Sequence, residues 1–179
     1  MTAGPEDGAR WFMVTIVGAD RPGIVAQVTG ALYRGGCNLG DATMARLGGN
    51  FAVMLMVEGA DAAPLERLLQ AVTREFGLRL HIDPIEGTLH SQQEPNVQIT
   101  VYGADRPGIV AQVTGALAAT GFNILDLDSD VGGTPGRPVY VMIIDGLVEG
   151  GAPAAERALA PVRADGIDVH VTALEPLVG

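Results

Sequence analysis

Alternating and helical patterns of apolar residues divide the first half of the chain into six predicted elements. Trp11–Gly18 is an apolar run rich in β-branched residues, which is typical of a strand. Between Pro22 and Gly35, apolar residues such as Val28 and Leu32 recur at helical spacing and share one face. The same criteria predict further strands over Cys37–Leu47, Phe51–Glu58 and Leu78–Asp83, and a second helix over Pro64–Phe76. The predicted order is strand, helix, strand, strand, helix, strand.

This order returns in the second half, and one segment returns letter for letter. Gly18–Leu32 reads GADRPGIVAQVTGAL, and Gly103–Leu117 repeats it 85 positions later. Identity over this length indicates a tandem repeat. The second half accordingly predicts strands over Val97–Gly103, Phe122–Val131, Val139–Asp145 and Ile167–Ala173, with helices over Pro107–Thr120 and Pro153–Ala164.

The repeat predicts two domains of the same α+β class. We expect a flexible tail over residues 1–10, a first domain over 11–83, a polar linker over 84–95 and a second domain over 96–179. A βαββαβ order is typical of the ferredoxin-like fold, a four-stranded antiparallel sheet with both helices on one face.

Composition narrows the classes of function. The formal net charge of -10 argues against direct binding of nucleic acid, which depends on Lys and Arg neutralising phosphates. No apolar run reaches the roughly 20 residues that span a bilayer, and the first residues contain no secretory apolar segment. We therefore expect a cytoplasmic protein that does not enter a membrane. A single cysteine, Cys37, excludes an internal disulfide.

The repeated segment contains the turn Asp-Arg-Pro-Gly, which is predicted to start a helix. Proline is favoured at the first helical position, so Pro22 predicts Arg21 as the N-cap residue. Arginine has no short oxygen to accept a hydrogen bond there. The N–H groups of Gly23, Ile24 and Val25 are then left to find other acceptors.

Two interpretations of this turn follow from its chemistry. Free N–H groups at a helix start attract a carboxylate, and Asp20 just outside the helix offers a negative charge to an ammonium group. A free amino acid carries both groups on one carbon, so the turn matches a zwitterion. In the alternative interpretation, the Asp20 side chain itself caps the helix and water satisfies the remaining N–H groups.

The element order, the duplicated turn and an Asn-apolar start to the strand after the first helix of each repeat resemble the ACT domain, an amino-acid-binding module. Two such domains alone resemble the glycine-cleavage-system transcriptional repressor family. The resemblance implies that Asp20 acts with Asn38, and Asp105 with Asn123, each pair 18 residues apart. Many serine-binding relatives differ in having Asn at the place of Asp20 and His at the place of Gly18. The expected ligand-binding residues are Asp20, Arg21, Pro22, Gly23, Ile24, Asn38 and Leu39, and in the second repeat Asp105, Arg106, Pro107, Gly108, Ile109, Asn123 and Ile124.

Other residues that could bind a metal or take part in catalysis do not match the patterns that such sites require. Asp126–Asp130 begins like a calcium loop, but the sixth position is Val131 and the twelfth is Arg137, which are not the Gly and Glu that such a loop requires. His81 and His170 have no neighbouring Cys or His cluster. We expect no catalytic residue, no metal site and no cofactor.

The leading hypothesis is a non-enzymatic sensor of a small amino acid, glycine or serine in type. It would act through a protein partner, a transcription factor or an enzyme, and the resemblance implies a place in transcriptional regulation of glycine cleavage. The two domains are expected to dock so that each helps to close the other's site, and the chain is expected to form a homodimer. Two alternatives stay open: a detached regulatory subunit of an amino-acid biosynthetic enzyme, or a ligand-free oligomerisation module.

Overall fold

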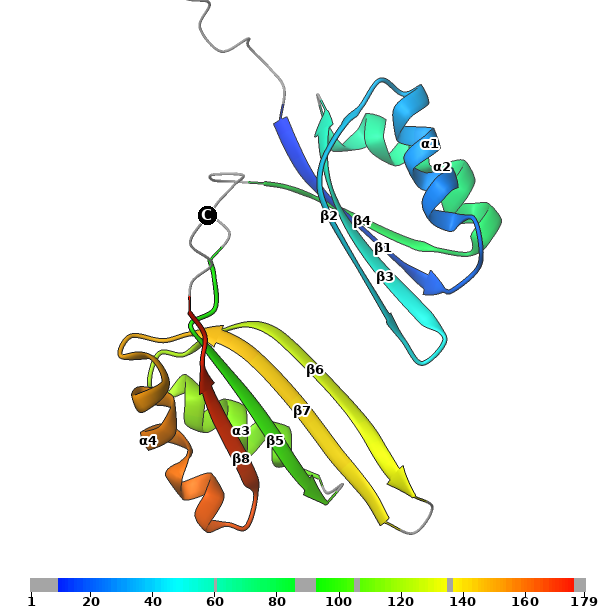
Figure 1. Cartoon of the computed structure of the whole chain (residues 1–179). Helices are drawn as coiled ribbons and strands as arrows, with labels where there is room; N and C mark the ends of the chain where they lie inside the picture. The colour runs from blue at the N-terminus through cyan, green and yellow to red at the C-terminus, as the bar shows by residue number, and fades with distance from the viewer. Residues whose placement is uncertain (1–9, 60, 86–92, 105–106, 135–136, 176–179) are drawn as a thin grey trace, which may run out of the picture. The chain divides into compact units, whose positions relative to one another are not determined.

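The computed structural model describes residues 10–59, 61–85, 93–104, 107–134 and 137–175 (Figure 1). The chain divides into two compact units, Met1–His90 and Ser91–Gly179, and each is described by itself. The finer boundaries expected from the sequence, including a linker over 84–95, stay predictions.

The first unit is a four-stranded antiparallel sheet with two helices on one of its faces (Figure 1). The strand order across the sheet is β2-β3-β1-β4, so β1 is paired on both sides. The elements in chain order are β1 Arg10–Ala19, α1 Ile24–Arg34, β2 Asn38–Leu47, β3 Asn50–Gly59, α2 Ala62–Phe76 and β4 Arg79–Pro84.

The alternation along β1 determines which face of the sheet is covered. Val14 and Ile16 are fully buried, whereas Met13 and Val17 on the other face are more than a third exposed. Because successive side chains of a strand point to opposite faces, the helices can cover only the face that Val14 and Ile16 share. The buried helix residues Ile24, Val28, Leu32, Leu65, Leu69 and Val72 complete this core.

The second unit repeats this architecture with strand order β6-β7-β5-β8 and helices α3 and α4 on one face (Figure 1). It has its own core around Ile99, Val101 and Leu117. Together the two units confirm the predicted α+β fold with two ferredoxin-like domains. The elements are β5 Val97–Ala104, α3 Ile109–Ala118, β6 Asn123–Thr134, β7 Arg137–Leu147, α4 Gly151–Ala164 and β8 Asp168–Ala173.

The second hairpin differs from its prediction. The sequence predicted that the first strand of this hairpin would end at Val131. The ladder instead continues through Gly132 paired with Val139 to Thr134 paired with Arg137. Backbone groups make these pairs, so the strand can continue beyond the apolar pattern that predicted it.

No helix in the described part of the chain is both long enough and apolar enough to cross a bilayer.

The close contact between Gly146 and Phe122 generates a stability prediction. A Cβ atom on Gly146 would lie 2.0 Å from Cε1 of Phe122 and 2.6 Å from the carbonyl oxygen of Asn123. We expect Gly146→Ala to lower the free energy of unfolding by about 1–3 kcal/mol, because a buried site without space must shift. Urea denaturation followed by circular dichroism measures the change.

Gly132→Ala is the matched control. A Cβ atom on Gly132 would meet nothing within 4 Å, so the stability should change by less than about 0.5 kcal/mol. Equal midpoints for both variants would show that Phe122 does not pack as described.

Candidate functional site

The start of α1 differs from its prediction in a way that bears on binding. Gly23, with φ 89° and ψ -10°, is the N-cap residue, and the helix begins at Ile24. Arg21 is therefore not the N-cap, and Pro22 is not the first helical residue. The angles of Gly23 are those of the third residue of a type II turn, for which Pro-Gly is a favoured central pair. Glycine accepts this left-handed conformation because it has no Cβ atom.

The backbone at this helix start has unused donors. The first backbone hydrogen bond of the helix runs from the N–H of Gln27 to the carbonyl of Gly23, at 2.9 Å. No side chain caps the helix. The N–H groups of Ile24, Val25 and Ala26 have no acceptor among the residues that the structure describes. Ile24 and Val25 are among the predicted donors. The observed set of three begins one residue later than the predicted set, which began at Gly23.

The second repeat builds the same helix start. Gly108 is the N-cap residue of α3, with φ 95° and ψ -8°, and no side chain caps that helix. The N–H of Gln112 donates to the carbonyl of Gly108 at 2.9 Å. Asp105 and Arg106 lie outside the described residues. The repeated sequence therefore produces the same backbone geometry twice.

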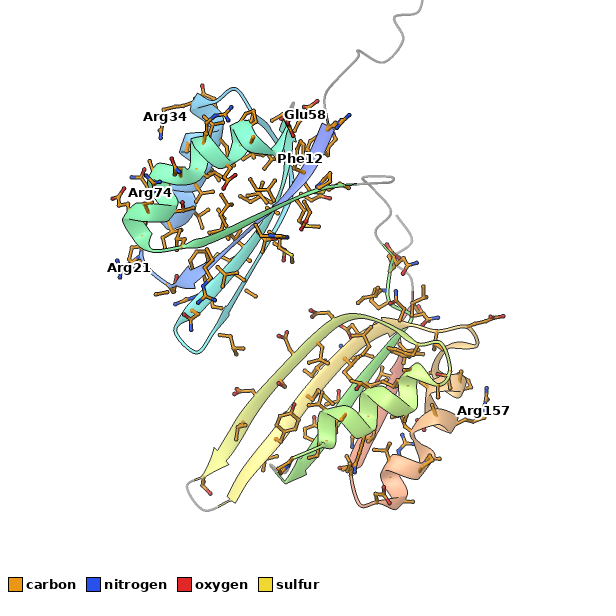
Figure 2. All side chains as sticks on the ribbon, turned by 180° about the vertical axis from the view of Figure 1, so that it is seen from behind. Phe12, Arg21, Arg34, Glu58, Arg74 and Arg157 are labelled. Carbon is orange, nitrogen blue, oxygen red and sulfur yellow. The ribbon has the colours of Figure 1, made fainter. Side chains whose placement is uncertain are left out.

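Asp20 lies beside the turn and has a partner that the sequence did not indicate. Its carboxylate is 2.5 Å from the guanidinium of Arg46 on β2, and its side chain is 24% exposed. Its backbone N–H donates to the carbonyl of Gly49 at 3.0 Å. The alternative in which Asp20 caps α1 does not describe this structure. Arg21, labelled in Figure 2, is exposed at the same turn, whereas Ile24 is buried in the core.

Asn38 lies at the opposite end of the first unit from Asp20. Its Nδ2 donates to Oε2 of Glu58 at 3.3 Å, and Arg21 and Glu58 mark the two ends in Figure 2. About eight residues of β2 separate Asn38 from Arg46, which corresponds to about 25 Å at strand spacing. A single amino acid cannot touch Asp20 and Asn38 of the same unit.

The second unit shows the same separation along its edge strand. Asn123 begins β6, and its Nδ2 donates to Oε1 of Gln93 at 2.8 Å. The turn around Gly108 follows the far end of β5, where Ala104 pairs with Val139. The neighbours of the two asparagines also differ in environment, since Leu39 is exposed and Ile124 packs partly against the core.

A hollow that sequence analysis missed lies on the first unit. Its volume is about 720 Å³, and none of the predicted site residues lines it. Val17 pairs with Ala52 on one side and with Arg79 on the other, so these three residues share the sheet face that the helices leave open. The remaining lining residues are Gly18, Ala19, Ala45, Leu47, Asn50, Phe51 and Gly77.

The other candidate groups lie on surfaces. His81 pairs with Asp83 at 3.0 Å and His170 with Asp168 at 3.3 Å, and all four side chains are more than half exposed. Within the described ranges, no group of three or more His, Cys, Asp or Glu side chains is placed to hold a metal ion. Burial raises the pKa of the Cys37 thiol above its usual value.

Comparison with known proteins places the chain in a family. One ACT-domain model matches residues 10–83 and another matches residues 97–163, so the chain belongs to the ACT-domain family. It is 29% identical over 121 residues to the glycine cleavage system transcriptional repressor of Escherichia coli (strain K12). That match covers 66% of this chain and 64% of the repressor, which is less than two thirds of the relative's length.

The chain is also similar to a solved structure and to a further protein in sequence. A crystal structure of an unknown protein from Galdieria sulphuraria superposes with a TM-score of 0.79 at 26% identity, over 93% of this chain and 99% of that one. A UPF0237 protein of Methanopyrus kandleri is 33% identical over 73 residues, which covers 41% of this chain and 81% of the relative.

The left-handed glycine at the start of α3 generates a second prediction. Gly108→Ala should lower the free energy of unfolding by about 1–2 kcal/mol, because a Cβ atom is strained at φ 95°. Gly115→Ala, inside the same helix, should raise it by about 0.5–1 kcal/mol, since its Cβ atom would meet nothing within 4 Å. Thermal melts of the two variants should move in opposite directions. A stabilising Gly108→Ala would contradict the turn geometry.

The raised pKa of Cys37 generates a third prediction. The thiolate is the reactive form, so a raised pKa leaves less of it at neutral pH. We expect Cys37 in the folded protein to react with iodoacetamide more slowly than free cysteine, and the rate to recover in urea. Equal rates in the folded and unfolded states would contradict the burial of this side chain.

Proposed function

We propose that this chain is a regulatory protein without catalytic activity of its own. It binds a small amino acid, glycine or serine foremost, at its two strand–helix turns and acts through a protein partner. The observation that carries the proposal is the pair of identical helix starts, each capped by a left-handed glycine and without a side-chain acceptor.

The carboxylate of the amino acid would bind N–H groups at the helix start that have no acceptor among the described residues. In the first turn these are the N–H groups of Ile24, Val25 and Ala26. The positive end of the helix dipole favours an anion at this place. Gly23 has nothing within 4 Å of its Cβ position, which leaves room for a ligand to approach the backbone.

The ammonium group of the amino acid would bind Asp20. Its carboxylate is partly exposed, and among the described residues it contacts the guanidinium of Arg46. An ionised carboxylate can accept about four hydrogen bonds, so one partner does not saturate it. Arg21, Pro22 and Ile24 have supporting roles in this proposal, because they shape the turn around the ligand.

Unlike the turn residues, the asparagines cannot contact an amino acid that is bound at the turn of their own unit. Asn38 and Asn123 lie too far from the turn of their own unit to touch the same ligand. If either contacts an amino acid held at a turn, that turn belongs to another ACT domain. The same holds for Leu39 and Ile124, which directly follow the asparagines: each could contact only an amino acid held at the turn of another ACT domain.

The name of the Escherichia coli relative suggests the output. That protein is called a transcriptional repressor of the glycine cleavage system. With a net charge of -10, this chain is poorly suited to neutralise DNA phosphates. We therefore propose that it reaches transcription through another protein, and we expect no mobility shift of DNA with the purified chain alone at physiological salt.

Calorimetry with free amino acids tests this function. We expect glycine and serine to bind in the micromolar to millimolar range. Glycolate, which lacks the ammonium, and glycinamide, which lacks the carboxylate, should bind more weakly, because each loses one of the paired contacts. Asp20→Ala and Asp105→Ala should each weaken one site by roughly 1.5–3 kcal/mol, the range for a hydrogen bond to a charged group.

Glu66→Ala is the matched control, since it removes one exposed carboxylate on α2 away from the turn. It should bind glycine as the unaltered protein does. If none of the twenty amino acids binds at several millimolar, the proposed function fails, and a ligand-free oligomerisation module becomes the better hypothesis.

A further inference from the structure

The hollow on the first unit lies over a row of small apolar side chains. Ala45 on the edge strand β2 pairs with Ala52 on β3, and Ala52 pairs with Val17 on β1. These three side chains therefore lie side by side on the face of the sheet opposite the helices (Figure 1). Because two of the three are alanines, the row fills little of the space beside the sheet, and the hollow of about 720 Å³ lies there.

A second row at the end of the sheet also lines the hollow. Leu47 pairs with Asn50, and Asn50 pairs with Ala19, so these residues share the same open face. Leu47 is 82% exposed and Val17 is 39% exposed. A molecule in the hollow would remove part of both apolar side chains from water, which favours binding of an apolar group.

Arg79 adds a positive charge to this apolar hollow. It pairs with Val17, which extends the first row to the fourth strand, β4. Among the described residues, no side chain forms an ion pair or a hydrogen bond with its guanidinium. Asp83, which shares this face of β4, contacts His81 instead, at 3.0 Å. None of the described lining residues is Asp or Glu, so the charge that the hollow complements is negative.

We propose that this hollow binds a free aliphatic carboxylic acid of medium chain length. The carboxylate binds the guanidinium of Arg79, whose planar N–H donors match a carboxylate. The alkyl chain lies across the apolar row from Val17 to Ala45. No acidic side chain among the described lining residues would hold an ammonium group, so a zwitterionic amino acid does not match this site. The inference is independent of the proposed function, because none of the turn residues assigned to amino-acid binding lines the hollow.

The row across the sheet sets the length of the chain. Arg79 and Ala45 lie three strands apart, which corresponds to about 14 Å at the usual strand spacing. A short acid such as butyrate would leave the alanines uncovered, whereas octanoate can extend along the row. The volume of the hollow lies within the roughly 300–1,000 Å³ of small-molecule sites, which combine apolar walls with a few polar groups.

Calorimetry with octanoate as the probe tests the charge of the site. We expect octanoate to bind more tightly than butyrate, and more tightly than octanamide, which has no negative charge. Arg79→Gln should weaken octanoate binding about two- to fivefold, because Arg79 is exposed and water screens its charge. It should leave octanamide binding unchanged. Arg67→Gln, on the exposed side of α2, removes one positive charge elsewhere and serves as the control.

Filling the hollow tests its position. Ala52→Leu should weaken octanoate binding about tenfold or more, because the added side chain takes the space of the ligand. Ala71→Leu, on the exposed side of α2, is the matched control and should bind octanoate as the unaltered protein does. In NMR titrations, octanoate should shift the backbone amide signals of Val17, Ala45 and Ala52.

Three outcomes would overturn the proposal. The first is no octanoate binding to the unaltered protein at several millimolar. The second is equal binding by Ala52→Leu and Ala71→Leu. The third is a shift of the same amide signals with protein concentration alone, together with a dimer in sedimentation, which would show that a second copy of the chain covers this face. Glycine binding at the turns is unaffected by any of these results, so the proposed function stands or fails separately.

Discussion

Burial of a single face of the central strands is the constraint on which the rest of the structure depends. β1 and β5 pair on both sides, and each places its apolar residues against two helices. A shift of one residue in register would move Val14 and Ile16 to the open face and break the core. The register of each sheet is therefore strongly specified, and every position at the strand ends follows from it.

The position of the turn is a direct consequence of this packing. β1 must end where the sheet ends, and α1 must return across the same face, so a sharp reversal is required between Ala19 and Ile24. Pro22 and Gly23 make that reversal, with glycine in the left-handed conformation. The reversal leaves the first N–H groups of α1 without acceptors in the part of the chain that the structure describes. The chain reversal that the fold requires therefore leaves the N–H groups that make the turn a candidate binding site.

The same topology separates the asparagines from the turns. Because α1 runs back along the sheet, the strand that follows it starts at the opposite end of the unit, with Asn38 beside Glu58. Each ACT domain therefore presents a turn at one end and an asparagine at the other. Duplication supplies two of each in one chain. The strand register places Arg46 of β2 across from Gly18 in the first unit and Val131 of β6 across from Gly103 in the second.

The sequence alone determined the fold class, the duplication and the location of the turns. These follow from local periodicity and from identical letters, which require no knowledge of distant contacts. The helix start was predicted two residues too early, because Pro-Gly can either begin a helix or form the turn before it. Arg46 could not be found from the sequence, since it lies 26 residues from Asp20 and meets it only across two strand pairings. Pairing across a sheet is decided by the tertiary structure, and so is the partner of each charge at the turn.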